Sequence, residues 1–265
     1  MSGRLDGKVC IVVGAGQQEG RTIGNGRATA VRFAQEGARL LLVDKVADAL
    51  GATEADALGV GAEVLGIVAD VTADDAPREI IHAARERFGR IDVLHNNVGI
   101  GTGDAPPHLL TDDAYDRIMD VNLRSTWRMC REVIPVMREQ QGGVITNVSS
   151  IASIAGTVIA AYRMSKAGVD ALTRNLAVTN AKHGIRVNAI LPGLIDTPLG
   201  VDSGARARGI DRDEYAAARA AAVPMGRQGT AWDVANAALF LAGDEAAFIS
   251  GVLLPVDGAQ SAKVG

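Results

Sequence analysis

Residues 9–44 read VCIVVGAGQQEGRTIGNGRATAVRFAQEGARLLLVD. The apolar, β-branched run Val9–Val13 leads into a glycine-rich turn, and a helical pattern follows over Gly24–Glu36. A second apolar run, Arg39–Val43, ends at Asp44. A strand, a helix and a second strand in this order predict a right-handed βαβ unit with two parallel strands.

The same alternation continues along the chain. Apolar runs predict further strands at Glu63–Ala69, Ile91–His95, Val144–Val148, Arg186–Ile190 and Leu253–Val256. Amphipathic stretches predict further helices at Val46–Leu58, Asp74–Phe88, Asp112–Glu139, Ala161–His183 and Trp232–Ala242. We therefore expect a single α/β domain over residues 1–265, a Rossmann-like, doubly wound parallel sheet of about seven strands flanked by helices.

The least regular stretch is Gly200–Gly229, which contains one small helix candidate at Asp213–Ala222. A long irregular segment inside a compact domain is typical of a lid or binding loop, and a poorly ordered surface insertion is the alternative. The stretch mixes apolar residues with several arginines. We expect it to line the substrate site and to favour a small to medium, mostly apolar substrate.

Composition excludes several classes of function. Apolar residues make up 48% of the chain and charged residues 22%, the balance of an ordinary globular protein. The net charge is −4 without a basic run, which argues against nucleic-acid binding. Cys10 and Cys130 lie in apolar stretches and predict free core thiols. The histidines have no metal-ligand spacing, and no apolar stretch is long enough for a membrane span, so we expect a cytoplasmic protein without a metal.

The glycine-rich turn and Asp44 predict a dinucleotide site. Glycines permit a tight turn and close backbone approach to a pyrophosphate, and the N-terminus of the next helix supplies N–H donors. A carboxylate at the end of the second strand, here Asp44, accepts hydrogen bonds from the ribose hydroxyls of NAD and repels the 2′-phosphate of NADP. The alternative for Asp44 is a cap of the following helix.

Tyr162 and Lys166 predict proton-transfer chemistry. Positions i and i+4 share one face of a helix, so both side chains project to the same side. A nearby ammonium favours the phenolate, and we expect it to lower the pKa of Tyr162 enough for acid–base work. Ser149 and Ser150 precede the pair and supply a hydroxyl that stabilises charge on a substrate oxygen. A solvated helix face is the alternative for an isolated Tyr-x-x-x-Lys pair.

In combination, these motifs resemble the short-chain dehydrogenase/reductase family over nearly the whole chain. Gly14, Gly24 and Gly26 match the glycines of its Thr-Gly-x-x-x-Gly-x-Gly turn, although Gly16 or Gly20 are alternatives for the first glycine. Ten positions separate Gly14 from Gly24, more than in that pattern, and Val13 replaces the threonine. Gln17–Thr22 is therefore an insertion of about six residues that either wraps the phosphates or forms part of the substrate mouth.

The resemblance implies further cofactor contacts at other strand ends. Asp70 and Val71 match the pair that holds the adenine. The remaining positions implied to bind the cofactor are Ile23, Asn97, Val98, Gly99, Pro192, Gly193, Ile195 and Thr197, together with Tyr162 and Lys166.

The resemblance also implies a catalytic set of Asn122, Ser150, Tyr162 and Lys166. Lys166 would reach the nicotinamide ribose, and Asn122 would anchor a water that links Lys166 to solvent. The choice between the two serines stays open: spacing to the tyrosine points to Ser149, and the position within the Ser-Ser pair points to Ser150, which we favour.

The predicted function is an NAD(H)-dependent oxidoreductase that interconverts a secondary alcohol and a ketone, working as a homotetramer or homodimer. One alternative is an enoyl-type or 3-oxoacyl-thioester reductase of the same fold, although enoyl reductases space tyrosine and lysine more widely. A non-catalytic cofactor-binding protein and a related lyase or epimerase are the others.

Overall fold

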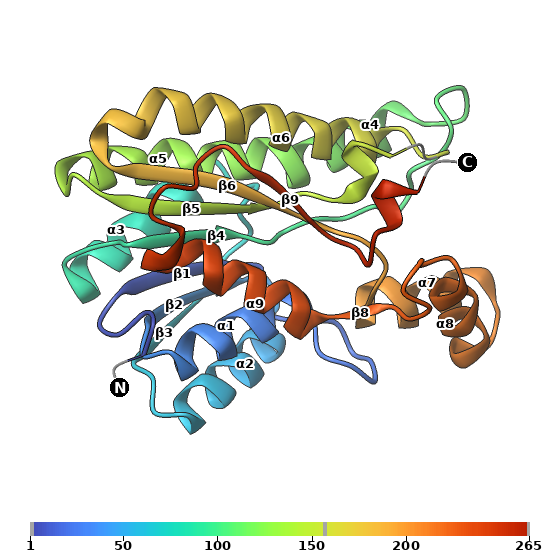
Figure 1. The fold of residues 1–265 in the computed structure, drawn as a ribbon, viewed down its shortest axis with the longest axis horizontal. Coiled ribbons are helices and arrows are strands. Elements are labelled where there is room, and N and C mark those ends of the chain that lie inside the picture. Colours follow the sequence, from blue (N-terminus) through green and yellow to red (C-terminus); the bar gives the residue numbers. More distant parts are fainter. Residues whose placement is uncertain (1–2, 156–157, 264–265) are drawn as a thin grey trace.

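The computed structural model describes residues 3–155 and 158–263. Seven strands form one parallel sheet in the order β3-β2-β1-β4-β5-β6-β9 (Figure 1). The strands are β1 (Val9–Val13), β2 (Arg39–Asp44), β3 (Val64–Val68), β4 (Val93–Asn96), β5 (Gly143–Val148), β6 (Ile185–Pro192) and β9 (Leu253–Val256). The predicted doubly wound sheet is thus confirmed, with strand ends that differ from the expected ones by a few residues at most.

Helices cover both faces of the sheet (Figure 1). One layer holds α1 (Asn25–Gln35), α2 (Ala47–Gly59) and α9 (Ala231–Ala242), and the other holds α3 (Ala76–Phe88), α5 (Ser125–Glu139) and α6 (Ala161–Asn180). Each layer has its own apolar cluster, centred on Phe33 and Leu239 in the first and on Ile80 and Met129 in the second. Burial of these two clusters is the main force that holds the helices to the sheet.

The helix expected over Asp112–Glu139 is interrupted. It divides into α4 (Asp112–Met119), a π-helical turn η1 (Asp120–Arg124) and α5. Two side chains bond the backbone inside this turn: Ser125 Oγ donates to Val121 O at 2.6 Å and Thr126 Oγ1 donates to Asn122 O at 2.9 Å. π-turns of this kind are common at functional sites, and this one carries the buried Asn122.

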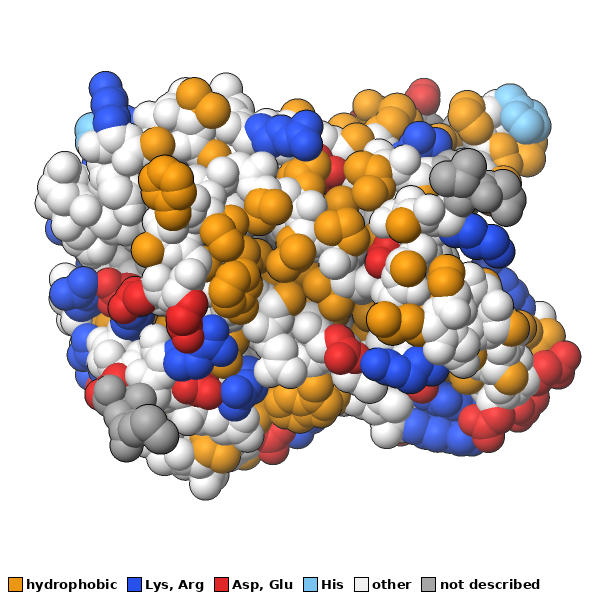
Figure 2. Space-filling view, in the orientation of Figure 1, with side chains coloured by type: hydrophobic (Ala, Val, Ile, Leu, Met, Phe, Trp, Pro, Cys, Tyr) orange, Lys and Arg blue, Asp and Glu red, His pale blue; other side chains and the backbone are white. Residues whose placement is uncertain are grey.

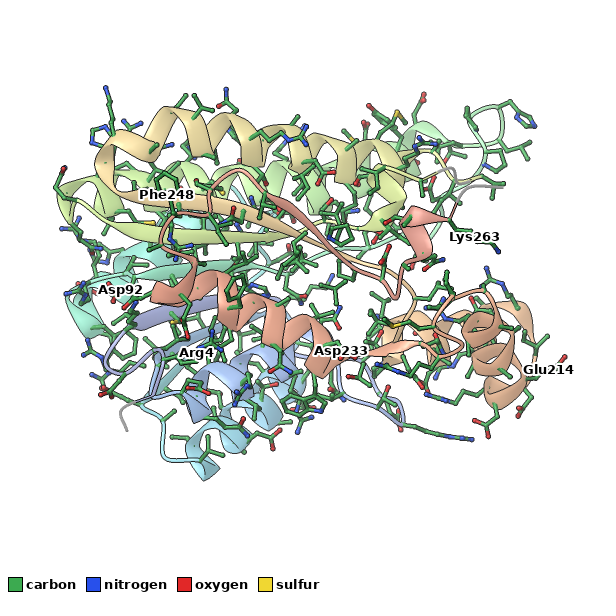
Figure 3. All side chains as sticks on the ribbon, in the orientation of Figure 1. Arg4, Asp92, Glu214, Asp233, Phe248 and Lys263 are labelled. Carbon is green, nitrogen blue, oxygen red and sulfur yellow. The ribbon has the colours of Figure 1, made fainter. Side chains whose placement is uncertain are left out.

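The region expected to be irregular is largely helical. Between β7 (Ile195–Asp196) and β8 (Gly229–Thr230), which pair with each other, lie η4 (Pro198–Asp202), α7 (Ser203–Arg208) and α8 (Arg212–Ala221). We call residues 197–228 the lid. It projects beyond the sheet at the right of Figure 1, and Figure 3 places Glu214 at its outer end. In the described residues, no helix has both the length and the apolarity needed to cross a membrane.

Candidate active site

The glycine turn after β1 meets the start of α1 at very short range. Gly14 has φ +78°, which favours glycine, and a Cβ on Gly26 would lie 1.9 Å from Gly14 O. Asn97, which follows β4, donates from Nδ2 to the same Gly14 oxygen at 2.9 Å. The structure therefore brings Gly14, Gly26 and Asn97 together between β1 and β4, where the strand order reverses. Ligands bind at this point in doubly wound sheets.

The N-terminus of α1 opens toward this turn. Gly24 occupies the N-cap position, and its N–H donates to Gln17 Oε1 at 2.9 Å. The first turn of α1 contains no acidic residue, so the positive end of the helix dipole is not neutralised locally. Ile23 packs on a small apolar cluster between α1 and α9. A free helix N-terminus beside a glycine turn is suited to binding a phosphate group.

Asp44 ties the end of β2 to the glycine turn. Its carboxylate accepts the Gly16 N–H at 2.9 Å and the Val46 N–H at 3.0 Å, and the side chain is half-buried. Val46, rather than Asp44, occupies the N-cap position of α2. Asp44 therefore places a negative charge beside the turn, where a ribose hydroxyl can reach it.

Asp70 and Val71 lie just after the carboxyl end of β3. Asp70 is exposed and accepts hydrogen bonds from Thr72 N at 3.0 Å and Thr72 Oγ1 at 2.7 Å. These bonds and the charge of Lys45 hold the pKa of Asp70 below its ordinary value. The Val71 side chain belongs to the core cluster beneath α3 and α5.

The segment after β6 connects the sheet to the lid. The Gly193 N–H donates to Val256 O at 3.0 Å, and a Cβ on Gly193 would lie 2.6 Å from Asp257 Cβ. Pro192, Ile195 and Thr197 are buried. The Thr197 hydroxyl caps the first turn of the lid, because it accepts the Gly200 N–H at 3.1 Å.

The insertion in the glycine turn, residues 17–22, lies against the lid, and we call it the strap. Arg21 Nη1 binds Asp213 Oδ1 at 2.8 Å, and the Arg21 N–H donates to Asp202 Oδ1 at 3.4 Å. Ser203 Oγ donates to Gln18 Oε1 at 2.7 Å. These bonds join segments about 180 to 190 residues apart in the chain.

A partly buried guanidinium, that of Arg212, organises the lid beneath the strap. Arg212 Nη2 binds Asp196 Oδ1 at 2.6 Å, and Arg212 Nε binds Asp202 Oδ1 at 3.4 Å. Thr22 Oγ1 of the strap donates to the same Asp196 oxygen at 3.4 Å. Strap, lid and the end of β7 therefore share one network of charges.

Lys166 lies at the opposite side of the site, on α6. Its side chain is only 2% exposed, and Nζ donates to Val148 O at the end of β5 at 2.8 Å. A Cβ on Gly99 would lie 3.0 Å from this Nζ, so the absence of a side chain there leaves space for the lysine head. Burial lowers the pKa of Lys166 to about 8, against a partial opposing effect of Asp170.

Tyr162 lies one turn before Lys166, and its hydroxyl hydrogen-bonds the Ser150 side chain. Burial raises the pKa of Tyr162, and the bond from Ser150 opposes that rise in part. The expected lowering by Lys166 is therefore wrong for this structure. The physical reason is that desolvation of the phenol dominates, while Lys166 Nζ lies 5.7 Å from the ring centroid and is bound to a backbone carbonyl.

The two serines of the pair have different neighbours. Ser149 is buried, and its Oγ donates to Lys166 O at 3.1 Å. Ser150 faces Tyr162, and its Oγ also accepts the Ala152 N–H at 3.1 Å. The geometry brings Ser150, and not Ser149, to the Tyr162 hydroxyl.

Asn122 is completely buried in the π-turn and joins three elements. Its Oδ1 accepts the Ile100 N–H at 2.8 Å, and its Nδ2 donates to Ile100 O at 2.9 Å and to Ser165 Oγ at 3.0 Å. Ser165 Oγ in turn donates to Tyr162 O at 2.8 Å. Asn122 thus connects the loop after β4 to the helix that carries Tyr162 and Lys166.

Sequence reasoning missed two groups at this site. The carboxylate of Asp104 accepts the Tyr162 N–H at 2.7 Å. The Arg212 network and the Arg21–Asp213 pair are the other group. These partners are distant in the chain and belong to no local motif. The signal in the sequence was limited to charged residues in irregular segments, to which no motif gives a role.

Comparison with known proteins agrees with this geometry. Residues 20–259 match a family model described as enoyl-(acyl carrier protein) reductase. Levodione reductase from Leifsonia aquatica is 38% identical over 263 residues, which cover 98% of this chain and 96% of that protein.

The chain belongs to the short-chain dehydrogenase/reductase family.

Other members of the family show the same likeness. The 3-oxoacyl-(acyl-carrier-protein) reductase of Thermotoga maritima is 38% identical over 256 residues, 96% of this chain and 98% of that protein. The crystal structure of carveol dehydrogenase from Mycobacterium avium in complex with NAD matches with a TM-score of 0.91 and 29% identity, over 98% of this chain and 100% of that chain. As a short-chain dehydrogenase/reductase, the protein is an oxidoreductase acting on CH–OH groups with a nicotinamide dinucleotide.

Proposed function

We propose that the protein is an NAD(H)-dependent enzyme that interconverts a secondary alcohol and a ketone. The observation that carries the proposal is the Ser150–Tyr162 hydroxyl pair with Lys166 one helical turn beyond. All three side chains lie near the carboxyl ends of the central strands, the edge that also carries the glycine turn.

The residues at this edge fit a dinucleotide. The contact of Gly26 with Gly14 leaves no room for a side chain, and the N-terminus of α1 is free to bind a phosphate. The carboxylate of Asp44 supports NAD over NADP, because a 2′-phosphate beside it would be repelled. When bound, the nicotinamide supplies or accepts the hydride. The remaining implied cofactor contacts, Asn97 to Gly99 and Pro192 to Thr197, follow β4 and β6 along the same edge.

Side chains of the protein carry out the proton transfer. Tyr162 takes the proton of the substrate hydroxyl in oxidation and returns it to the carbonyl oxygen in reduction. Ser150 donates to the same oxygen as charge develops there. Lys166 keeps a positive charge beside the phenol below a pH of about 8, and Asn122 holds the backbone of the loop after β4 against α6.

The strap and the lid cover the dinucleotide in this proposal. The strap begins directly after the glycine turn, and the lid begins at Thr197. Their contacts cross from the phosphate side to the nicotinamide side, so the strap and the lid would close together over a bound cofactor. Exposed apolar residues of the lid, Leu199 and Met225, support a mostly apolar substrate.

The direct test is a panel of secondary alcohols and ketones with NAD(H) and NADP(H), followed by the absorbance of NADH or NADPH. The expected result is turnover of an apolar secondary alcohol with NAD in preference to NADP. A 3-oxoacyl thioester and a crotonyl thioester are included, because relatives and the matching family model carry those reductase names. Turnover of the crotonyl thioester alone, or preference for NADP, would overturn the proposal.

A pair of serine variants tests the assignment within the site. Ser150→Ala removes the hydroxyl that meets Tyr162 and should lower kcat by about 10²-fold. Ser149→Ala removes a bond to the backbone of Lys166 and should act mainly on stability. Equal losses of kcat in both variants would contradict the assignment of Ser150.

We also propose a homo-oligomer. Trp127 on α5 and Trp232 and Phe240 on α9 are partly exposed, and Phe248, labelled in Figure 3, is fully exposed. Figure 2 shows hydrophobic side chains gathered along the middle of the face that carries α9 and β9. Light scattering during size-exclusion chromatography should give the mass of a dimer or tetramer, and a monomer at micromolar concentration would contradict the proposal.

A further inference from the structure

The start of the catalytic helix α6 is capped from a distant loop. The carboxylate of Asp104 accepts four backbone N–H groups. Its Oδ1 accepts from Ala105 at 2.8 Å, Ala160 at 3.2 Å and Ala161 at 3.0 Å, and its Oδ2 accepts from Tyr162 at 2.7 Å. The cap therefore bonds the backbone of the residue that carries the phenol.

The local sequence offers no such cap. The N-cap residue of α6 is Ala160, which has no side-chain oxygen, and its backbone has α-region angles rather than the extended ones of an ordinary cap. The first N–H groups of a helix need an acceptor, and a negative charge there also interacts favourably with the helix dipole. Asp104 meets both needs from 56 to 58 residues away. A remote cap, unlike a local one, also fixes where the helix begins relative to the rest of the site.

The loop that carries Asp104 is itself anchored at two points. Asn122 binds both backbone groups of Ile100, at 2.8 and 2.9 Å. Arg117 Nη2 on α4 donates to Thr102 O at 2.5 Å. These bonds fix the backbone just before Asp104, so its carboxylate has a defined position relative to α6.

The same loop borders the Tyr162 ring. A Cβ on Gly101 would lie 3.6 Å from Tyr162 Cδ2, an ordinary contact distance. The loop therefore lies beside the ring, its Asp104 binds the backbone N–H of the same residue, and Ser150 meets the hydroxyl.

We propose that Asp104 is a positioning residue: its carboxylate fixes the first turn of α6 so that the Tyr162 hydroxyl stays in register with Ser150. The inference rests on the proposed function of Tyr162 in proton transfer. Displacement of a reacting group by about 1 Å costs up to roughly 10²-fold in rate. A carboxylate is needed because Asn at this position would turn an NH₂ group toward one of the backbone N–H donors.

The test is Asp104→Asn, with Asp233→Asn as the matched control. Asp233 lies in the first turn of α9, on the other face of the sheet, and Figure 3 labels it there. Its Oδ2 accepts from Thr230 N at 2.7 Å and from Thr230 Oγ1 at 2.8 Å. Both variants convert a helix-capping carboxylate to an amide of the same shape, and only one of them touches α6.

Both variants should lower the melting temperature by a few degrees. Asp104→Asn alone should lower kcat by roughly ten- to a hundredfold with the KM for NAD nearly unchanged. It alone should also speed hydrogen exchange at the amides of residues 160–162. Wild-type kcat in Asp104→Asn, or an equal loss of kcat in Asp233→Asn, would overturn the inference.

Two further measurements keep the outcomes separate. If Asp104→Asn does not fold, Asp104→Glu keeps the charge but displaces it by one methylene, and the same loss of kcat is expected. If the wild-type protein turns over no alcohol or ketone, the proposed function fails. Exchange at residues 160–162 then decides on Asp104 by itself, because unchanged exchange in the variant would show that the carboxylate does not hold the helix.

Discussion

On one side of the site, around Tyr162, buried side chains bind backbone groups: Lys166 binds Val148 O, and Asn122 binds both polar groups of Ile100. On the other side, the strap meets the lid through an ion pair, Arg21–Asp213, whose side chains are 61% and 67% exposed. A hydrogen bond from a buried charged group contributes about 1.5–3 kcal/mol, whereas an exposed ion pair contributes about 0–1 kcal/mol and is screened by salt.

This difference implies that one side of the site is fixed and that the other can open. The side around Tyr162 has one well-defined arrangement, because a change there leaves a buried polar group without a partner. The strap–lid side can open at small cost, as expected for segments that admit and release a cofactor. Substitutions around Tyr162 should therefore have large effects on the rate of the chemical step. Substitutions in the strap and the lid should have small effects on the rate of cofactor binding and release.

The largest effect is expected from Tyr162→Phe. Without the phenol oxygen, the substrate proton has no acceptor, and kcat should fall by at least about 10²-fold. The dissociation constant of NAD should stay within about twofold, because the glycine turn and Asp44 are unaltered. NADH absorbance gives the rate, and NADH fluorescence titration gives the affinity. Retained turnover would show that the Ser150–Tyr162 pair does not carry the chemistry.

Lys166→Met tests the cost of the buried charge. Burial lowers the pKa of Lys166 from an ordinary value of 10.5 to about 8. At neutral pH the lysine is therefore charged in both states, but its charged form is less stable in the folded protein than in the unfolded chain. The sign follows from proton counts: between these two pKa values the unfolded chain binds more protons, so this group destabilises the wild type below pH 8, and the penalty disappears as pH rises toward 10.5.

The change in unfolding free energy caused by Lys166→Met includes loss of the bond to Val148 O at either pH. The change should nevertheless be more favourable at pH ~7 than at pH ~10, by about 2–3 kcal/mol. Urea unfolding at both pH values measures the difference, and Lys182→Met, at an exposed lysine of the turn that follows α6, is the matched control. A change in unfolding free energy that is the same at both pH values would contradict a buried charge at Lys166.

The sequence predicted the sheet and the placement of Tyr162 and Lys166 on one helix because both depend on local patterns. Alternating strands and helices gave the order of elements, and the four-residue step from Tyr162 to Lys166 placed both on one helix face. The π-turn around Asn122 was not predictable, since its hydrophobic pattern differs little from that of a continuous helix. The direction of the pKa shift of Tyr162 depends on burial, which a motif does not contain.

The strap–lid side was much harder to predict for a different reason. An insertion was visible between Gly14 and Gly24, but its partners lie about 180 to 190 residues away. Arg21 and Asp213 are common surface residues with no motif around them. Contacts of this kind arise only when the fold brings two irregular segments together.

Asp44→Asn tests the carboxylate beside the glycine turn, which lies between the strap and the side around Tyr162. The substitution keeps the shape of the side chain and removes the charge that faces the glycine turn. Loss of a charge-assisted hydrogen bond of about 1.5 kcal/mol should raise the KM for NAD about tenfold and reduce the preference for NAD over NADP. Asp48→Asn, at an exposed position in α2, should change neither. An unchanged cofactor preference would show that Asp44 serves only the backbone.

The smallest effect is expected from Arg21→Ala, which removes the ion pair between strap and lid. An exposed pair worth about 0.2–1 kcal/mol corresponds to release of NADH faster by roughly one and a half- to fivefold, with kcat for chemistry unchanged. Stopped-flow displacement of NADH measures the release. Arg78→Ala breaks a similarly exposed pair with Asp75 on α3 and is the matched control. The difference from wild type should vanish at about 1 M salt, where the Debye length is about 3 Å. Identical release rates at low salt would mean that the strap does not restrain the lid, and the contrast between the two sides would then rest on the buried residues alone.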